Sequence, residues 1–214
     1  MVACGVALLA VWWPWLLVAV GFVLHGQVVC APQLGRLGPV APGGRSLAEL
    51  LDDGRYQGVP VREEPAGPYG GGRYVPAAGE IRLAEGMLAR RDVDALMILA
   101  HERTHAARDW PAPRWYRVGL VVVFLVALAL GLNGRIDAGL ARAVMVGAYL
   151  VPVLHVMRNE VVASAGAMAR TAGWPRPARL AAFRRLGAAF GVYVGEWALV
   201  GLVVLAGLAV LSCG

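Results

Sequence analysis

Residues 101–105 read His-Glu-Arg-Thr-His, which matches the pattern H-E-x-x-H. Two histidines four residues apart fall on one face of a helix, so both imidazoles can reach a single zinc ion. The glutamate beside the first histidine can then polarise a zinc-bound water. This motif predicts zinc-dependent hydrolysis, with His101 and His105 as metal ligands and Glu102 as the general base.

The motif must lie on a helix that turns its histidines towards a cleft. Asp92 is the expected N-cap of this helix, which should run from Val93 to about Arg108. Upstream, Ser46 and Glu49 form a capping-box pattern before a short helix. Three short strands are expected, at Gly58–Arg62, Tyr74–Pro76 and Glu80–Leu83. A minimal zincin-like α+β domain has this order of elements: a helix, a small layer of strands and then the motif helix.

The composition of the whole chain indicates a membrane protein. Of its 214 residues, 58% are hydrophobic and only 16% are charged, which is too apolar for a typical soluble domain. Spanning a bilayer takes about 20 mostly apolar residues. Four apolar blocks come near this length, at about Val6–Leu24, Val118–Leu132, Ala143–Met157 and Phe190–Leu211. We therefore expect a mainly α integral membrane protein with about four transmembrane helices, the middle two forming a hairpin.

The charge pattern predicts which side of the membrane holds the motif. The net charge is +6, every basic residue is arginine, and residues 158–189 hold six arginines against Glu160 alone. The positive-inside rule places such a segment in the cytoplasm, and tracing back through the hairpin places the motif there too. A nucleic-acid partner is not expected, because the stretch around the motif is nearly balanced in charge.

These observations divide the chain into five segments. They are an N-terminal transmembrane helix at 1–24, a zincin-like catalytic domain at 25–115, a transmembrane hairpin at 116–157, an Arg-rich cytoplasmic segment at 158–189 and a C-terminal transmembrane helix at 190–214.

Catalytic zinc usually takes three protein ligands and leaves a position for water. The acidic residues after the motif are Asp109, Asp137, Glu160 and Glu196. Asp109 is too close to the motif to fold back easily, and the predicted topology puts Asp137 on the opposite side of the membrane. Glu160 lies on the side of the histidines and is the expected third ligand. Glu196, inside the last apolar block, is a second choice or a group that supports the site.

A further donor should stabilise the oxyanion of the reaction. Tyr74, His155 and Arg103 are candidates, and the sequence does not rank them. Each also has a structural interpretation: a strand tyrosine in packing, a polar group at the end of a span and a solvated arginine.

Several stretches of the chain match a known family. They are Leu47–Asp52, Gly58–Val61, Tyr74–Pro76, Ile81–Glu85, Ala100–Ala106 and Glu160–Ser164. In these stretches the chain resembles the YugP-type bacterial membrane zinc metallopeptidases, of the gluzincin type. The resemblance implies an N-terminal span, a small zincin domain, one zinc ion and a place in the bacterial plasma membrane. It also implies that Glu160 is the third ligand. Three positions depart from the family's pattern: this chain has Thr104 where the family has a glycine, and Val75 and Val162 where the family has aspartates.

The expected function is that of a membrane-bound zinc metalloendopeptidase, acting on peptides or membrane proteins at the lipid bilayer. The alternative is a non-catalytic membrane scaffold or interaction protein that keeps zinc as a structural element. The presence of Glu102 argues against this alternative, because a structural zinc site needs no general base. The sequence leaves the oligomeric state open.

Overall fold

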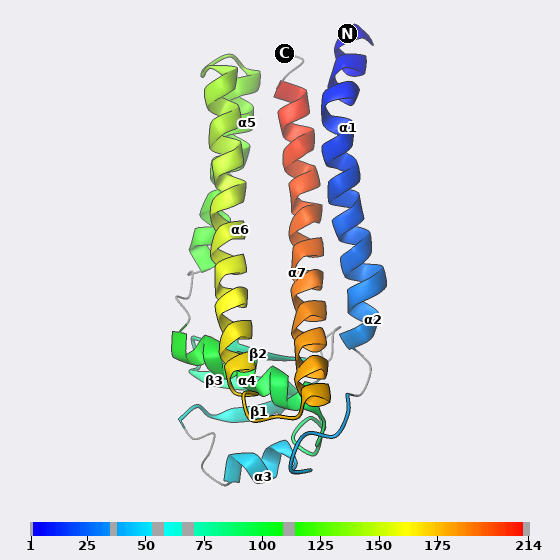
Figure 1. The fold of residues 1–214 in the computed structure, drawn as a ribbon. Coiled ribbons are helices and arrows are strands. Elements are labelled where there is room, and N and C mark those ends of the chain that lie inside the picture. The colour runs from blue at the N-terminus through cyan, green and yellow to red at the C-terminus, as the bar shows by residue number, and fades with distance from the viewer. Residues whose placement is uncertain (1, 35–37, 53–57, 66–70, 109–113, 212–214) are drawn as a thin grey trace. The chain divides into compact units, whose positions relative to one another are not determined.

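The computed structural model describes residues 2–34, 38–52, 58–65, 71–108 and 114–211 (Figure 1). The chain divides into two compact units. The helical unit comprises Met1–Gln27, Ala112–Met157 and Gly191–Gly214, and the sheet unit comprises Val28–Pro111 and Arg158–Phe190. Most of the domain expected at 25–115 thus forms a unit together with the whole Arg-rich segment at 158–189.

Long helices account for most of the described residues. The chain begins with α1 (Val2–Leu24), a π-helical turn η1 (His25–Cys30) and α2 (Ala31–Leu34). The later helices are α5 (Arg114–Leu132), α6 (Ala138–Ala169) and α7 (Arg176–Leu211). The prediction of a mainly helical chain is confirmed.

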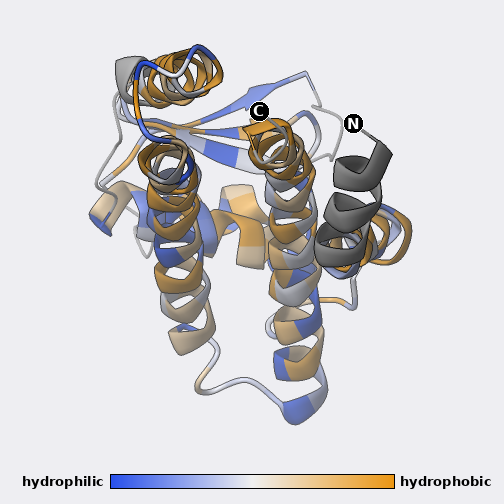
Figure 2. Cartoon of the chain, turned by 90° about the horizontal axis from the view of Figure 1, so that it is seen from above, coloured by the Kyte–Doolittle hydropathy of each residue, from blue (hydrophilic) through white to orange (hydrophobic). Residues whose placement is uncertain are grey.

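Among the described residues, three helical stretches are long and apolar enough to cross a membrane: Trp13–Cys30, Ala138–Ala169 and Arg176–Leu211. Much of the length of α5, α6 and α7 has the colour of hydrophobic residues in Figure 2. Large apolar side chains such as Leu17, Leu154 and Val203 are exposed. Extensive apolar exposure is the property of a surface that meets lipid or a partner. The second expected span, Val118–Leu132, is a shorter apolar helix, so the number of four spans stays a prediction.

The helices α6 and α7 extend beyond the apolar blocks that predicted them. Those blocks end at Met157 and begin at Phe190, whereas α6 continues to Ala169 and α7 begins at Arg176. Hydropathy marks only the apolar part of a helix, and the alanine-rich residues on both sides of the turn at 170–175 favour its continuation. The Arg-rich segment is therefore two helix ends joined by a turn, and Glu160 lies inside α6.

The sheet unit contains a three-stranded sheet in the order β1-β3-β2, formed by β1 (Val61–Glu64), β2 (Gly72–Val75) and β3 (Glu80–Ala84). β1 runs parallel to β3, with Val61 opposite Ile81. β2 runs antiparallel to β3, with Tyr74 also opposite Ile81. All three strands lie within two or three residues of their predicted positions, and β2 forms an edge of the sheet.

Side-chain caps set the beginnings of two helices in this unit, one before the sheet and one after it. Before α3 (Leu47–Asp52), the amide of Ser46 donates to Glu49 Oε2 at 2.7 Å and the amide of Glu49 donates to Ser46 Oγ at 3.3 Å. This reciprocal pair is the predicted capping box. Before α4 (Val93–Arg108), Asp92 Oδ1 accepts from the amide of Ala95 at 3.1 Å. The predicted N-cap and bounds of the motif helix are confirmed.

The core of the sheet unit lies between the sheet, α4 and the ends of α6 and α7. Ile81 and Leu83 of β3, Leu99 of α4, and Ala167 and Ala182 of the long helices belong to one buried cluster. In β2, a Cβ at position 72 would lie 2.6 Å from Leu83 Cδ2 and 2.9 Å from Ile98 Cγ2, so only glycine fits there. Gly72 thereby lets α4 pack closely against the edge strand.

Candidate metal centre

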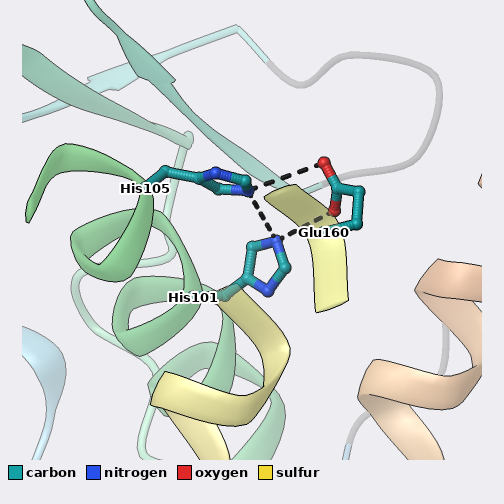
Figure 3. A group of neighbouring side chains, drawn as sticks. All are labelled: His101, His105 and Glu160. Carbon is teal, nitrogen blue, oxygen red and sulfur yellow. Dashed lines mark hydrogen bonds and ion pairs between the residues drawn. The ribbon is translucent and has the colours of Figure 1, made fainter. Parts of the chain in front are cut away.

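The two histidines of the motif and Glu160 form one buried group in the sheet unit (Figure 3). The Nε2 atoms of His101 and His105 are 3.0 Å apart. Glu160 Oε2 lies 3.2 Å from His101 Nε2, and Glu160 Oε1 lies 3.6 Å from His105 Nε2. The three side chains are only 10–11% exposed. α4 thus supplies two ligand atoms on one face, and α6 supplies the third.

The spacing of these atoms suits a small metal ion. In a tetrahedral zinc site with bonds of about 2.0–2.1 Å, neighbouring ligand atoms are separated by about 3.3 Å. The three separations in the structure, 3.0, 3.2 and 3.6 Å, lie around this value. Two imidazoles and one carboxylate are also ligands that zinc accepts in catalytic sites. The group could therefore hold a metal ion, as predicted for these three residues.

Small residues on α6 bring Glu160 to the histidines. A Cβ at position 166 would lie 2.5 Å from Thr104 Cγ2 and 2.7 Å from its Oγ1, so α6 approaches α4 closely at a glycine. Ala163, between Glu160 and Gly166 on this helix, is buried. Thr104 in turn donates its hydroxyl to the carbonyl of Ala100 at 2.9 Å. The crossing gives Thr104 a role: its side chain fills space that Gly166 leaves open.

Glu102 lies next to the metal group but makes a different contact. Its Oε2 accepts a hydrogen bond of 2.7 Å from the backbone amide of Tyr74, on edge strand β2. Burial raises the pKa of Glu102 to about 7, although the charges of His101 and His105 and the Tyr74 amide act in the opposite direction. A carboxyl group in this state can both accept and release a proton near neutral pH. The general base predicted from the motif thus lies at the edge of the sheet.

The other predicted site residues are placed differently. Tyr74 contributes its amide, while its side chain is partly buried against the core cluster, and Arg103 is buried on α4. His155 and Glu196 belong to the helical unit and are not members of the metal group.

One of the two rejected ligand candidates, Asp137, has a structural role. Asp137 accepts from the amide of Leu140 at 3.0 Å and caps α6. Asp109 lies outside the described residues.

A cavity of about 360 Å³ adjoins the metal group on the side of His105. It is lined by Thr104, His105, Arg108, Arg158, Asn159, Val162 and Ala163. Arg108 and Arg158 were not among the residues that the sequence predicted for the site. Their spacing could have indicated that they lie near the site, since Arg108 follows His105 by three residues on the motif helix and Arg158 precedes Glu160 by two residues.

Comparisons with models of protein families, with curated proteins and with solved structures found no match. The resemblance to the YugP-type peptidases therefore stays a prediction from the sequence motifs.

Proposed function

We propose that the protein is a membrane-bound zinc-dependent endopeptidase. The observation that carries this proposal is the place of Glu102, a buried carboxyl group beside the His101–His105–Glu160 group and hydrogen-bonded to an edge strand. A zinc site that only stabilises the fold would need the three ligands but no second carboxyl group at such a strand.

Zinc is the ion that this ligand set favours. His101, His105 and Glu160 would leave a fourth position open, as catalytic zinc sites do. When bound, the ion would polarise the scissile carbonyl and lower the pKa of water towards neutrality.

The remaining chemistry belongs to Glu102 and to the edge of the sheet. Glu102 accepts one proton from the attacking water as the C–O bond forms. It then delivers that proton to the leaving nitrogen as the C–N bond breaks, so one peptide bond and one water give a carboxyl group and an amine. The edge of β2 can align an extended peptide by strand addition, which puts the scissile bond near Glu102.

The proposed location is the bacterial plasma membrane, with the site on the cytoplasmic side. This rests on the three membrane-length helices, on α5 as a shorter fourth span, and on the arginine excess of residues 158–189. Membrane proteins and the segments next to their spans are the proposed substrates.

The test is to purify the protein in detergent, measure bound zinc and assay the cleavage of casein and of quenched fluorescent peptides. We expect about one zinc ion per chain. Glu102→Gln should keep the zinc and lose at least about 100-fold in activity, because the proton acceptor is gone. Glu160→Ala should lose the zinc. Glu85→Gln, on an exposed carboxylate of the same unit, is the matched control and should behave like the wild type.

The outcomes separate the two functions considered. Wild-type activity in Glu102→Gln would overturn the peptidase proposal. Bound zinc in a wild-type protein that cleaves none of these substrates would favour the structural-zinc scaffold.

A further inference from the structure

The cavity beside the metal group is positively charged along one wall. Arg108 lies in the last turn of α4, and Arg158 lies on α6 just before Glu160. The other lining residues are a metal ligand, His105, and the uncharged residues Thr104, Asn159, Val162 and Ala163. No acidic residue is among the seven lining residues, so the cavity has no carboxylate of its own to balance the two arginines.

Other arginines of the sheet unit form ion pairs with carboxylates. Five of them lie 2.7–3.4 Å from a carboxylate oxygen, namely Arg62, Arg73, Arg82, Arg90 and Arg91. Within the part of the chain that the structure describes, Arg108 and Arg158 have no such ion pair. Both are exposed, so both guanidinium groups can donate hydrogen bonds to a ligand carboxylate, for which their geometry is well suited.

We propose that this cavity binds an acidic side chain of the peptide substrate, close to the scissile bond. The inference rests on the proposed peptidase function and adds the substrate class. Because His105 belongs both to the metal group and to the cavity wall, a side chain in the cavity would lie next to the predicted metal ligands. A volume of about 360 Å³ holds an aspartate or glutamate side chain together with some water. Val162 and Ala163 offer an apolar wall to the methylene groups of that side chain.

The test uses three peptides that differ at one position beside the cleaved bond, where they carry Glu, Gln or Lys. For wild-type protein in detergent, we expect kcat/KM for the Glu peptide to exceed that for the Gln peptide by about tenfold and that for the Lys peptide by more. Arg108→Gln and Arg158→Gln should each reduce this preference, and Arg158→Glu should favour the Lys peptide. Arg184→Gln, an exposed arginine on α7 that does not line the cavity, is the matched control. Zinc content and circular dichroism of each variant establish that the site and fold persist.

A binding measurement separates this inference from the proposed function. Fluorescence anisotropy of the labelled peptides on Glu102→Gln reports binding without turnover. One outcome is that the Glu peptide binds more tightly, that this depends on both arginines, and that the wild type cleaves none of the peptides. This outcome would support the cavity assignment and overturn the proposed peptidase function.

Cleavage without charge preference would overturn the cavity assignment and leave the peptidase standing. The assignment would also fall if the arginine variants altered turnover of all three peptides equally and only in nanodiscs of anionic lipid. That result would mark the arginines as lipid contacts.

Discussion

Asp92 shows how one side chain can set the start of the helix that carries the metal ligands. Its Oδ1 accepts from the amide of Ala95, and both of its oxygens accept from the guanidinium of Arg90, at 2.7 and 2.8 Å. Burial alone would raise the pKa of Asp92, but these hydrogen bonds outweigh it, so the pKa is lowered. The charged form of Asp92 is therefore the one that stabilises α4.

The pH dependence of stability should follow from this shift. Since the pKa of Asp92 is lower in the folded state, its contribution is fully present above the unfolded pKa of about 3.9 and is lost as the pH falls through the folded pKa. Asp92→Asn keeps an N-cap but cannot titrate. The free energy of unfolding of this variant should therefore decrease less than that of the wild type between about pH 6 and about pH 3. Asp92→Ala should cost about 1 kcal/mol at neutral pH. Thermal unfolding in detergent measures both, and parallel pH curves for wild type and Asp92→Asn would contradict the assignment.

At the scale of helices, the metal group depends on how closely α6 approaches α4. The contact between Thr104 and Gly166 is complementary in shape, because the larger residue lies on one helix and the glycine on the other. The family that the motif resembles has its glycine at the position of Thr104. In this chain the small residue is on α6 instead, which explains how a threonine fits in the motif.

A double-mutant cycle tests this contact. Gly166→Ala should push α6 away and weaken zinc binding by at least about tenfold, because a ligand displaced by a few tenths of an ångström binds poorly. Thr104→Ala should have little effect alone, and in combination with Gly166→Ala it should restore most of the affinity by removing the clashing atoms. Competition with a chromogenic chelator gives the dissociation constants.

The control for this cycle is Gly187→Ala, at a helical glycine of α7 with open space around it. Its zinc affinity should equal that of the wild type. Additive effects of the substitutions at Thr104 and Gly166 would rule out the proposed contact.

Local sequence patterns predicted the elements well, and the contacts between elements were harder to predict. The capping box at Ser46 and the N-cap at Asp92 are determined within four residues, so the sequence suffices. The parallel pairing of β1 with β3 and the Thr104–Gly166 contact join distant residues, and no local pattern specifies them. The cavity arginines were missed for the same reason, since Arg108 and Arg158 meet only when two helices cross.

For the whole molecule, orientation in the membrane is the property that decides which proteins the site can reach. The turn at 170–175 and the arginine-rich helix ends beside it lie on the same stretch as Glu160. If these arginines remain in the cytoplasm, the ligand group remains there too.

Reporter fusions test this orientation. Alkaline phosphatase, which is active only outside the cytoplasm, should be active when fused after Gly134 and inactive when fused after Gly173. A fluorescent reporter that matures only in the cytoplasm provides the reciprocal control. Cytoplasmic signal after Gly134 would reverse the proposed orientation.

The hydrogen bond between Glu102 and the Tyr74 amide also bears on solubility. An edge strand presents unpaired amides to which strands of other copies can add, and natural proteins cover such edges. In this chain the carboxylate of Glu102 covers one edge amide of β2. Removing that carboxylate would leave a donor without its acceptor and open the edge to self-association. Glu102→Gln keeps an oxygen acceptor there, whereas Glu102→Ala would expose the strand and favour aggregation of the purified protein.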